Sequence, residues 1–201
     1  MIGRDATPDA ARTFITANSV HKTDAEFRKG EHAAKLIAYA KGKSAEPAHM
    51  ECSTRSNLLQ HVLNEMGYRT RKVAIFDTDT NMESHTLLDV WNATARRWET
   101  QDADFGIWWQ DLKGNRVSLA DYAQKPDKIV PCSAKGCDWS HAKRLEQYLD
   151  IISITDKATG ERYAIYTTRA DLRRIYTKGN KRGLFCEVEA KRCTDGFTRA
   201  Q

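Results

Sequence analysis

Residues 49–76 read HMECSTRSNLLQHVLNEMGYRTRKVAIF, and the hydrophobic period of this stretch changes halfway along it. In its first half, four apolar residues recur at three- and four-residue steps, the spacing of one helix face: Leu59, Val62, Leu63 and Met66. Gly67 is typical of a helix C-terminus, and residues 71–78, RKVAIFDT, then read as a strand. The stretch therefore predicts a helix that begins beside Cys52 and leads into a sheet.

Two further strands are predicted downstream, at residues 84–92 (SHTLLDVWN) and 97–102 (RWETQD), with turns before and between them. A helix followed by an antiparallel meander predicts an α+β fold, in which the helix packs on a small antiparallel sheet. We therefore expect Cys52 to lie at the N-terminus of a helix packed on that sheet.

The flanking sequence suggests three parts. Residues 1–22 are a polar, loose or partly helical lead-in, residues 23–130 the core, and residues 131–201 a C-terminal elaboration packed on the core. Within the core, residues 24–43 predict a helix with an apolar face, residues 103–119 an irregular tryptophan-bearing segment, and residues 118–124 a short capped helix. The apolar face of the first of these helices consists of Phe27, Ala34, Ile37 and Ala40. In the elaboration, residues 150–168 predict a hairpin.

Composition and charge narrow the class of protein. The 201 residues are 40% hydrophobic and 29% charged, as in ordinary globular proteins, and no apolar run reaches membrane-spanning length. The net charge is +5, and the densest basic patch is residues 169–182, RADLRRIYTKGNKR. Such a patch attracts anionic polymers, but no aromatic ladder or nucleic-acid motif accompanies it, so nucleic acid is disfavoured as a partner.

Five cysteines divide into two close pairs and one isolated residue, Cys52. The pairs are Cys132 with Cys137 and Cys186 with Cys193. Two short disulfide loops plus one reactive thiol would leave this pattern. There are two alternatives to this pattern. One is a zinc site built from the two pairs, with His141 replacing one sulfur, and the other is four reduced thiols.

Disulfide pairing would favour an oxidising compartment. We therefore expect a periplasmic or secreted protein whose leader has been removed, or a cytoplasmic protein if Met1 is the native start.

A thiol at a helix N-terminus is favoured as thiolate, but a nucleophile also needs a base and the base an orienting partner. His61 lies nine residues after Cys52 on the same helix, so it projects about 180° away. His85 opens a strand, and Asp102 ends the next one, where it can hold the imidazole. Of the remaining histidines, His49 falls in a loop, and three fall in predicted helical or polar surface segments: His21, His32 and His141.

This ordered set of residues resembles the transglutaminase-like superfamily of papain-like cysteine enzymes. In that family the nucleophilic cysteine opens a helix, and its histidine and aspartate come from adjacent strands of a small antiparallel sheet. The resemblance implies that Cys52 is the nucleophile, His85 the base and Asp102 the third residue of the triad. It covers about residues 45–105, and five flanking positions also match: Gly67, Arg71, Asp89, Val90 and Trp98.

The sequence departs from the family pattern at two places. Glu51 precedes Cys52 and no tryptophan lies upstream, which leaves the second oxyanion donor unassigned. Asp102 is followed by ADFG where the family commonly has a proline, so Asp104 is a less favoured alternative to Asp102.

The resemblance implies a thiol hydrolase or acyltransferase that acts on a protein or peptide through an acyl-enzyme, with no metal or organic cofactor. Hydrolysis by a peptidase or amidase is favoured over transglutamination. The alternative is a non-catalytic binding protein on the same scaffold, which would use the basic patch around Arg173 and Lys181 for an anionic polymer or a protein partner. The oligomeric state stays open.

Overall fold

The computed structural model describes residues 6–22, 29–77, 84–156, 162–167, 174–175 and 186–187. These residues form a mixed α+β fold around an eight-stranded antiparallel sheet with the strand order β10-β9-β3-β4-β5-β6-β7-β8. The α+β class with an antiparallel sheet is as predicted. The sheet is larger than the predicted meander, because later segments add strands on both sides of it.

The strands of this sheet are β3 (Thr70–Phe76), β4 (Ser84–Asn92), β5 (Arg97–Asp102), β6 (Ile107–Asp111), β7 (Ile129–Ser133), β8 (Gly136–Cys137), β9 (Ile151–Asp156) and β10 (Arg162–Thr167). The helices are α1 (Pro8–Ala17), α2 (Lys29–Ala40), α3 (Cys52–Glu65), α4 (Leu119–Gln124) and α5 (Lys143–Glu146). Two short strand pairs lie outside the sheet: β1 (Ser19–His21) with β2 (Ala48–Met50), and β11 (Arg174–Ile175) with β12 (Cys186–Glu187).

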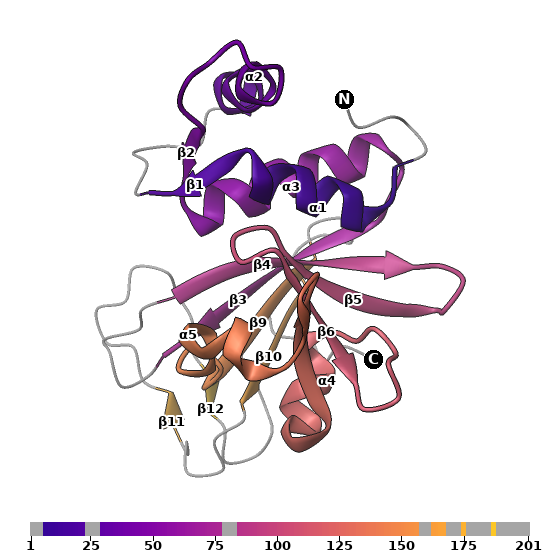
Figure 1. The fold of residues 1–201 in the computed structure, drawn as a ribbon. Coiled ribbons are helices and arrows are strands. Elements are labelled where there is room, and N and C mark those ends of the chain that lie inside the picture. Colours follow the sequence, from indigo (N-terminus) through magenta and orange to yellow (C-terminus); the bar gives the residue numbers. More distant parts are fainter. Residues whose placement is uncertain are drawn as a thin grey trace.

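Helices cover both faces of the sheet. Figure 1 shows α1, α2 and α3 on one side and α4 and α5 on the other. Because neighbouring residues of a strand point to opposite faces, Leu87 of β4 packs in the core on the α4 side, and Leu88 packs in the core under α1 and α3. This double covering buries the middle of β4 completely.

Helix α3 and the strands that follow it agree with the prediction. Leu59 and Leu63 are fully buried against the sheet, and Gly67 has the positive φ of +86° that lets the chain leave the helix. The amide of Tyr68 donates to the Leu63 carbonyl and closes the helix end. Strands β4 and β5 have the predicted bounds, and α4 begins at the capping box of Ser118.

Two local predictions were wrong. Residues 103–119 are not wholly irregular, since β6 crosses them and Trp109 alternates into the core. On α2 the buried residues are His32 and Leu36, whereas Ile37 is exposed. The apolar pattern of α2 is weak, and it is the packing of α2 against α3 and β2 that decides which side chains are buried. Phe27 lies outside the described residues.

Part of the predicted lead-in is a regular helix. Thr7 caps α1 through its side chain, and Ala11 and Ile15 pack into the same core cluster as α3. The segment then continues into β1, which runs parallel to β2 just before α3. The N-terminal segment thus belongs to the layer that carries Cys52.

The predicted C-terminal hairpin is confirmed, with β9 and β10 antiparallel from Arg162 opposite Asp156 to Thr167 opposite Ile151. Strand β9 also pairs with β3, so the elaboration extends the sheet of the core directly. The boundary predicted at residue 131 stays a prediction.

Most of the basic patch at residues 169–182 lies outside the described residues. Within the described ranges, no helix is long and apolar enough to cross a bilayer.

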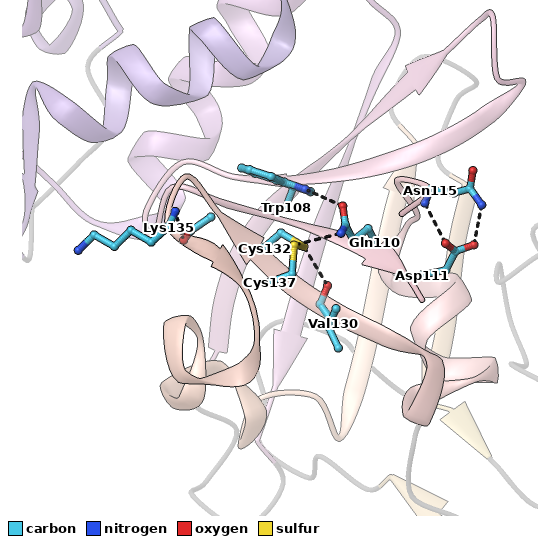
Figure 2. Close-up of a disulfide and its surroundings, with 9 residues drawn as sticks. Trp108, Gln110, Asp111, Asn115, Val130, Cys132, Lys135 and Cys137 are labelled. Carbon is cyan, nitrogen blue, oxygen red and sulfur yellow. Dashed lines mark hydrogen bonds between the residues drawn. A yellow bond between two sulfur atoms is a disulfide. The ribbon is translucent and has the colours of Figure 1, made fainter. Parts of the chain in front are cut away.

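One of the predicted disulfides is present, between Cys132 and Cys137. These residues are direct partners across β7 and β8, so the bond closes a hairpin at the edge of the sheet, and the Gln110 amide donates to the Cys137 sulfur at 3.0 Å (Figure 2). Bonded sulfurs are not thiolate ligands, which argues against the zinc site built from both pairs. Cys193 lies outside the described residues.

Candidate active site

Cys52 is the first residue of α3, and its thiol is free and half-buried. The preceding residue, Glu51, is the helix N-cap, but its side chain makes no capping hydrogen bond and accepts one from the Ser53 hydroxyl at 2.6 Å instead. The first-turn amides of a helix carry the positive end of the macrodipole. The sulfur therefore lies where a negative charge is stabilised.

His85 is the second residue of β4, and only 4% of it is exposed. Its Nε2 lies 2.8 Å from Oδ2 of Asp102, the last residue of β5. Strand pairing accounts for this contact, since Leu88 of β4 lies opposite Gln101 of β5. The two residues proposed from sequence to act together are thus hydrogen-bonded.

The Asp102 carboxylate is fully buried and held at both oxygens. Oδ2 lies against His85, and Oδ1 accepts from the backbone amides of Asp104 at 2.7 Å and Phe105 at 3.0 Å. A buried carboxylate with these partners has no freedom to rotate away from the imidazole. Its orientation is set by the turn that follows β5.

Asp104, the less favoured alternative, has other partners. Its carboxylate accepts from Arg55 Nη1 at 2.7 Å and lies 2.9 Å from His21 Nδ1. Asp102, rather than Asp104, is therefore the carboxylate at His85.

The charge state of His85 follows from its neighbours. Burial alone would lower the pKa of His85, but the charge and hydrogen bond of Asp102, together with those of Cys52, raise it from 6.5 to about 10. The imidazole is therefore cationic near neutral pH. Because Nε2 faces Asp102, Nδ1 is the ring nitrogen that remains for the Cys52 sulfur. The three groups therefore suit a thiolate–imidazolium pair that is oriented by a carboxylate.

Two aromatic rings enclose the imidazole. Phe105 meets it edge-on at 5.3 Å between ring centroids, and Tyr148 stacks on it at 6.5 Å with an interplanar angle of 28°. Tyr148 follows α5 and reaches the site because Leu149 bridges to Phe76 at the end of β3. No sequence pattern marked Tyr148 as a neighbour of His85.

The other histidines have different surroundings. His61 lies on the far part of α3, as its nine-residue spacing from Cys52 predicts. Its Nδ1 is 4.0 Å from Oε1 of Glu65. His49 is exposed on β2, whereas His32, which lies in a predicted helix, is buried on α2. His21 is exposed, as expected, but its bond to Asp104 was not predicted.

Cys52, His85 and Asp102 thus come from α3 and from the adjacent strands β4 and β5, with β3 between α3 and β4 along the chain. Among the described residues, no group of three or more histidine, cysteine or acidic side chains is arranged to hold a metal ion. No protein-family model matches the sequence, and no curated protein is significantly similar to it, so the transglutaminase-like resemblance stays a prediction from the sequence.

Proposed function

We propose that this chain is a cysteine-dependent amide hydrolase or acyltransferase with a papain-like core of the transglutaminase type. Cys52 is the nucleophile, His85 the general base and acid, and Asp102 the residue that orients His85. The observation that carries the proposal is the buried His85–Asp102 hydrogen bond, with the other partner of the imidazole at the N-terminus of α3. A cysteine at the start of a helix, with the histidine and the aspartate on two later, adjacent strands, resembles the order in the superfamily.

In the first half-reaction the Cys52 thiolate attacks the amide carbonyl, so that a C–S bond forms and the carbonyl oxygen becomes an oxyanion. The backbone amide of Cys52 is the oxyanion donor that the helix N-terminus provides. The protonated His85 then gives its proton to the leaving amine as the C–N bond breaks. The product is a thioester on Cys52 and a neutral imidazole.

In the second half-reaction His85 takes a proton from water, whose oxygen attacks the thioester and releases the acid and the thiolate. Asp102 keeps the imidazole in the same orientation throughout, since both carboxylate oxygens stay bonded. An amine in place of water would give transamidation. We favour hydrolysis of a protein or peptide amide, because water needs no acceptor site of its own.

Alkylation of Cys52 by iodoacetamide tests the proposal without a known substrate. An ordinary thiol with a pKa of about 8.5 is only about 3% thiolate at pH 7, so a thiolate held by His85 reacts about 10- to 30-fold faster. Mass spectrometry of the Cys52 peptide isolates this site from the other cysteines. His85→Ala should remove the advantage, whereas the matched control His61→Ala, on the far part of the same helix, should keep it.

A wild-type rate equal to that of free cysteine, unchanged in His85→Ala, would refute the proposal. It would favour the alternative of a binding protein on this scaffold.

A further inference from the structure

Arg55 lies three residues after Cys52, so both project from the same side of α3. The Arg55 side chain is 3% exposed, and its Nη1 donates both to the backbone carbonyl and to Oδ1 of Asp104, each at 2.7 Å. A buried cation is tolerated only where a counter-charge meets it. The helix that carries the nucleophile is thereby tied to the turn after β5.

Asp104 connects Arg55 with the triad. While its carbonyl and carboxylate accept from Arg55, its own amide donates to Oδ1 of Asp102 at 2.7 Å. The opposite oxygen of Asp102 lies against His85. One residue therefore stands between the Arg55 guanidinium and the carboxylate that orients the imidazole.

We infer that Arg55 is a positioning residue of this site. By binding Asp104, Arg55 fixes the turn of residues 102–105, and this turn holds Asp102 against His85. The inference rests on the proposed function of the triad. Arg55 touches neither His85 nor the sulfur in the bonds described, so its effect passes through Asp102.

Charge also supports this role. Asp102 and Asp104 are both buried within one turn, and their negative charges act on Arg55 together with that of Cys52. Without the cation, the Asp104 carboxylate would be desolvated and, among the residues that the structure describes, opposed only by His21, whose side chain is 57% exposed. The turn would then open towards solvent, and the two amides at Asp102 would lose their alignment.

The test compares Arg55→Lys and the double variant Arg55→Met/Asp104→Asn with the wild type. A matched control is Arg71→Met/Asp89→Asn, which removes a similarly buried ion pair four residues along β4 from His85. Two readouts are used: alkylation of Cys52 by iodoacetamide at pH 7, and the proton NMR resonance of the His85 ring N–H that faces Asp102. Thermal unfolding shows that each protein is folded.

We expect the double variant to lose about 10-fold in alkylation rate and to lose the downfield His85 resonance. Arg55→Lys, which keeps the charge but not the forked geometry, should lose about 3-fold. The control should keep both signals even if it unfolds at a lower temperature.

A folded double variant with the wild-type rate and resonance would overturn the inference. If the double variant does not fold, Arg55→Lys decides it, and an unchanged rate and resonance there would overturn it. An equal loss in the Arg71 control would also overturn it, since the effect would then be general destabilisation. Failure of the proposed function is separate, because the wild type itself would then lack fast, His85-dependent alkylation.

Discussion

Two buried charged pairs lie on β4 only four residues apart. His85 binds Asp102 at one end, and Asp89 binds Arg71 further along, with Arg71 Nε and Nη2 both 2.8 Å from Asp89 Oδ2. Both carboxylates are completely buried. Burial and opposite charge are therefore common to the two pairs and do not by themselves indicate chemistry.

The pairs differ in their surroundings. The Arg71 guanidinium packs 4.2 Å from the centroid of the Trp98 ring, while Thr100 donates to the other oxygen of Asp89 at 2.5 Å. The pair is thus held by an aromatic ring and a hydroxyl, which suits a structural element. His85 titrates, and its second nitrogen is directed to a half-buried thiol. A reactive pair needs a partner that can change its charge beside a group that substrate can reach.

The largest expected difference between the pairs is in turnover. Asp102→Asn should reduce hydrolysis of p-nitrophenyl acetate on the order of 10³-fold, because the amide orients the imidazole wrongly and does not stabilise its charge. Asp89→Asn, the matched change, should stay within about 10-fold of the wild type per folded molecule. Equal losses in both variants would erase the distinction.

For the free energy of unfolding, we expect the Arg71–Asp89 pair to be the important one. Arg71→Met leaves the Asp89 carboxylate buried without its cation, so the free energy of unfolding in urea should fall by about 3–5 kcal/mol. Arg71→Met/Asp89→Leu removes both charges and should recover most of that loss. If the single variant loses less than about 1 kcal/mol, the pair is not the structural element described above.

The pKa of His85 is the next measure of the difference. Cys52→Ala removes one of the groups that raise this pKa, so NMR titration should give a value below about 10 but still above 6.5, because Asp102 remains. A value at or below 6.5 would mean that Asp102 does not stabilise the imidazolium.

The raised pKa of His85 also affects stability. The folded state holds the proton more tightly than the unfolded state, so the contribution is complete below pH 6.5 and is lost as pH rises towards 10. In the Cys52→Ala background, where the pKa of His85 is lower, the difference in unfolding free energy between Cys52→Ala and Cys52→Ala/His85→Gln should shrink as pH rises from 6.5 through that lower pKa. A difference that grows with pH would have the wrong sign.

The smallest effect is expected at the disulfide. Cys132→Ala/Cys137→Ala opens a loop of only a few residues, so the unfolding free energy should fall by about 2 kcal/mol. The β7–β8 hairpin is separated from β4 by β5 and β6, so Cys52 alkylation should not change. A slower alkylation rate would show that this edge of the sheet supports the site.

Local pattern explains which elements could be predicted. The helix at Cys52 and the strands that carry His85 and Asp102 are each marked by their own hydrophobic period and by a glycine or a tight turn between them. Adjacent strands joined by a four-residue turn have few ways to pair. The sequence therefore favoured Asp102 as the partner of His85.

The contacts that hold those residues in place join segments that are far apart in the sequence. Arg55 meets Asp104 across 49 residues, His21 meets it across 83, and Arg12 reaches Gln101 across 89. A charged residue carries no local sign of its partner, because the pairing depends on how α1 and α3 pack on the sheet. Tyr148 reached His85 for the same reason.

The sequence by itself therefore determined the α+β class, the order of α3, β4 and β5, and the three residues proposed for chemistry. Each of these depends on neighbours within about one element along the chain. Only the tertiary structure decided that Asp102 and not Asp104 meets His85, that α2 buries His32, and that Arg55 lies behind the triad. Those choices depend on which desolvated groups find a partner, and that is settled when distant layers pack together.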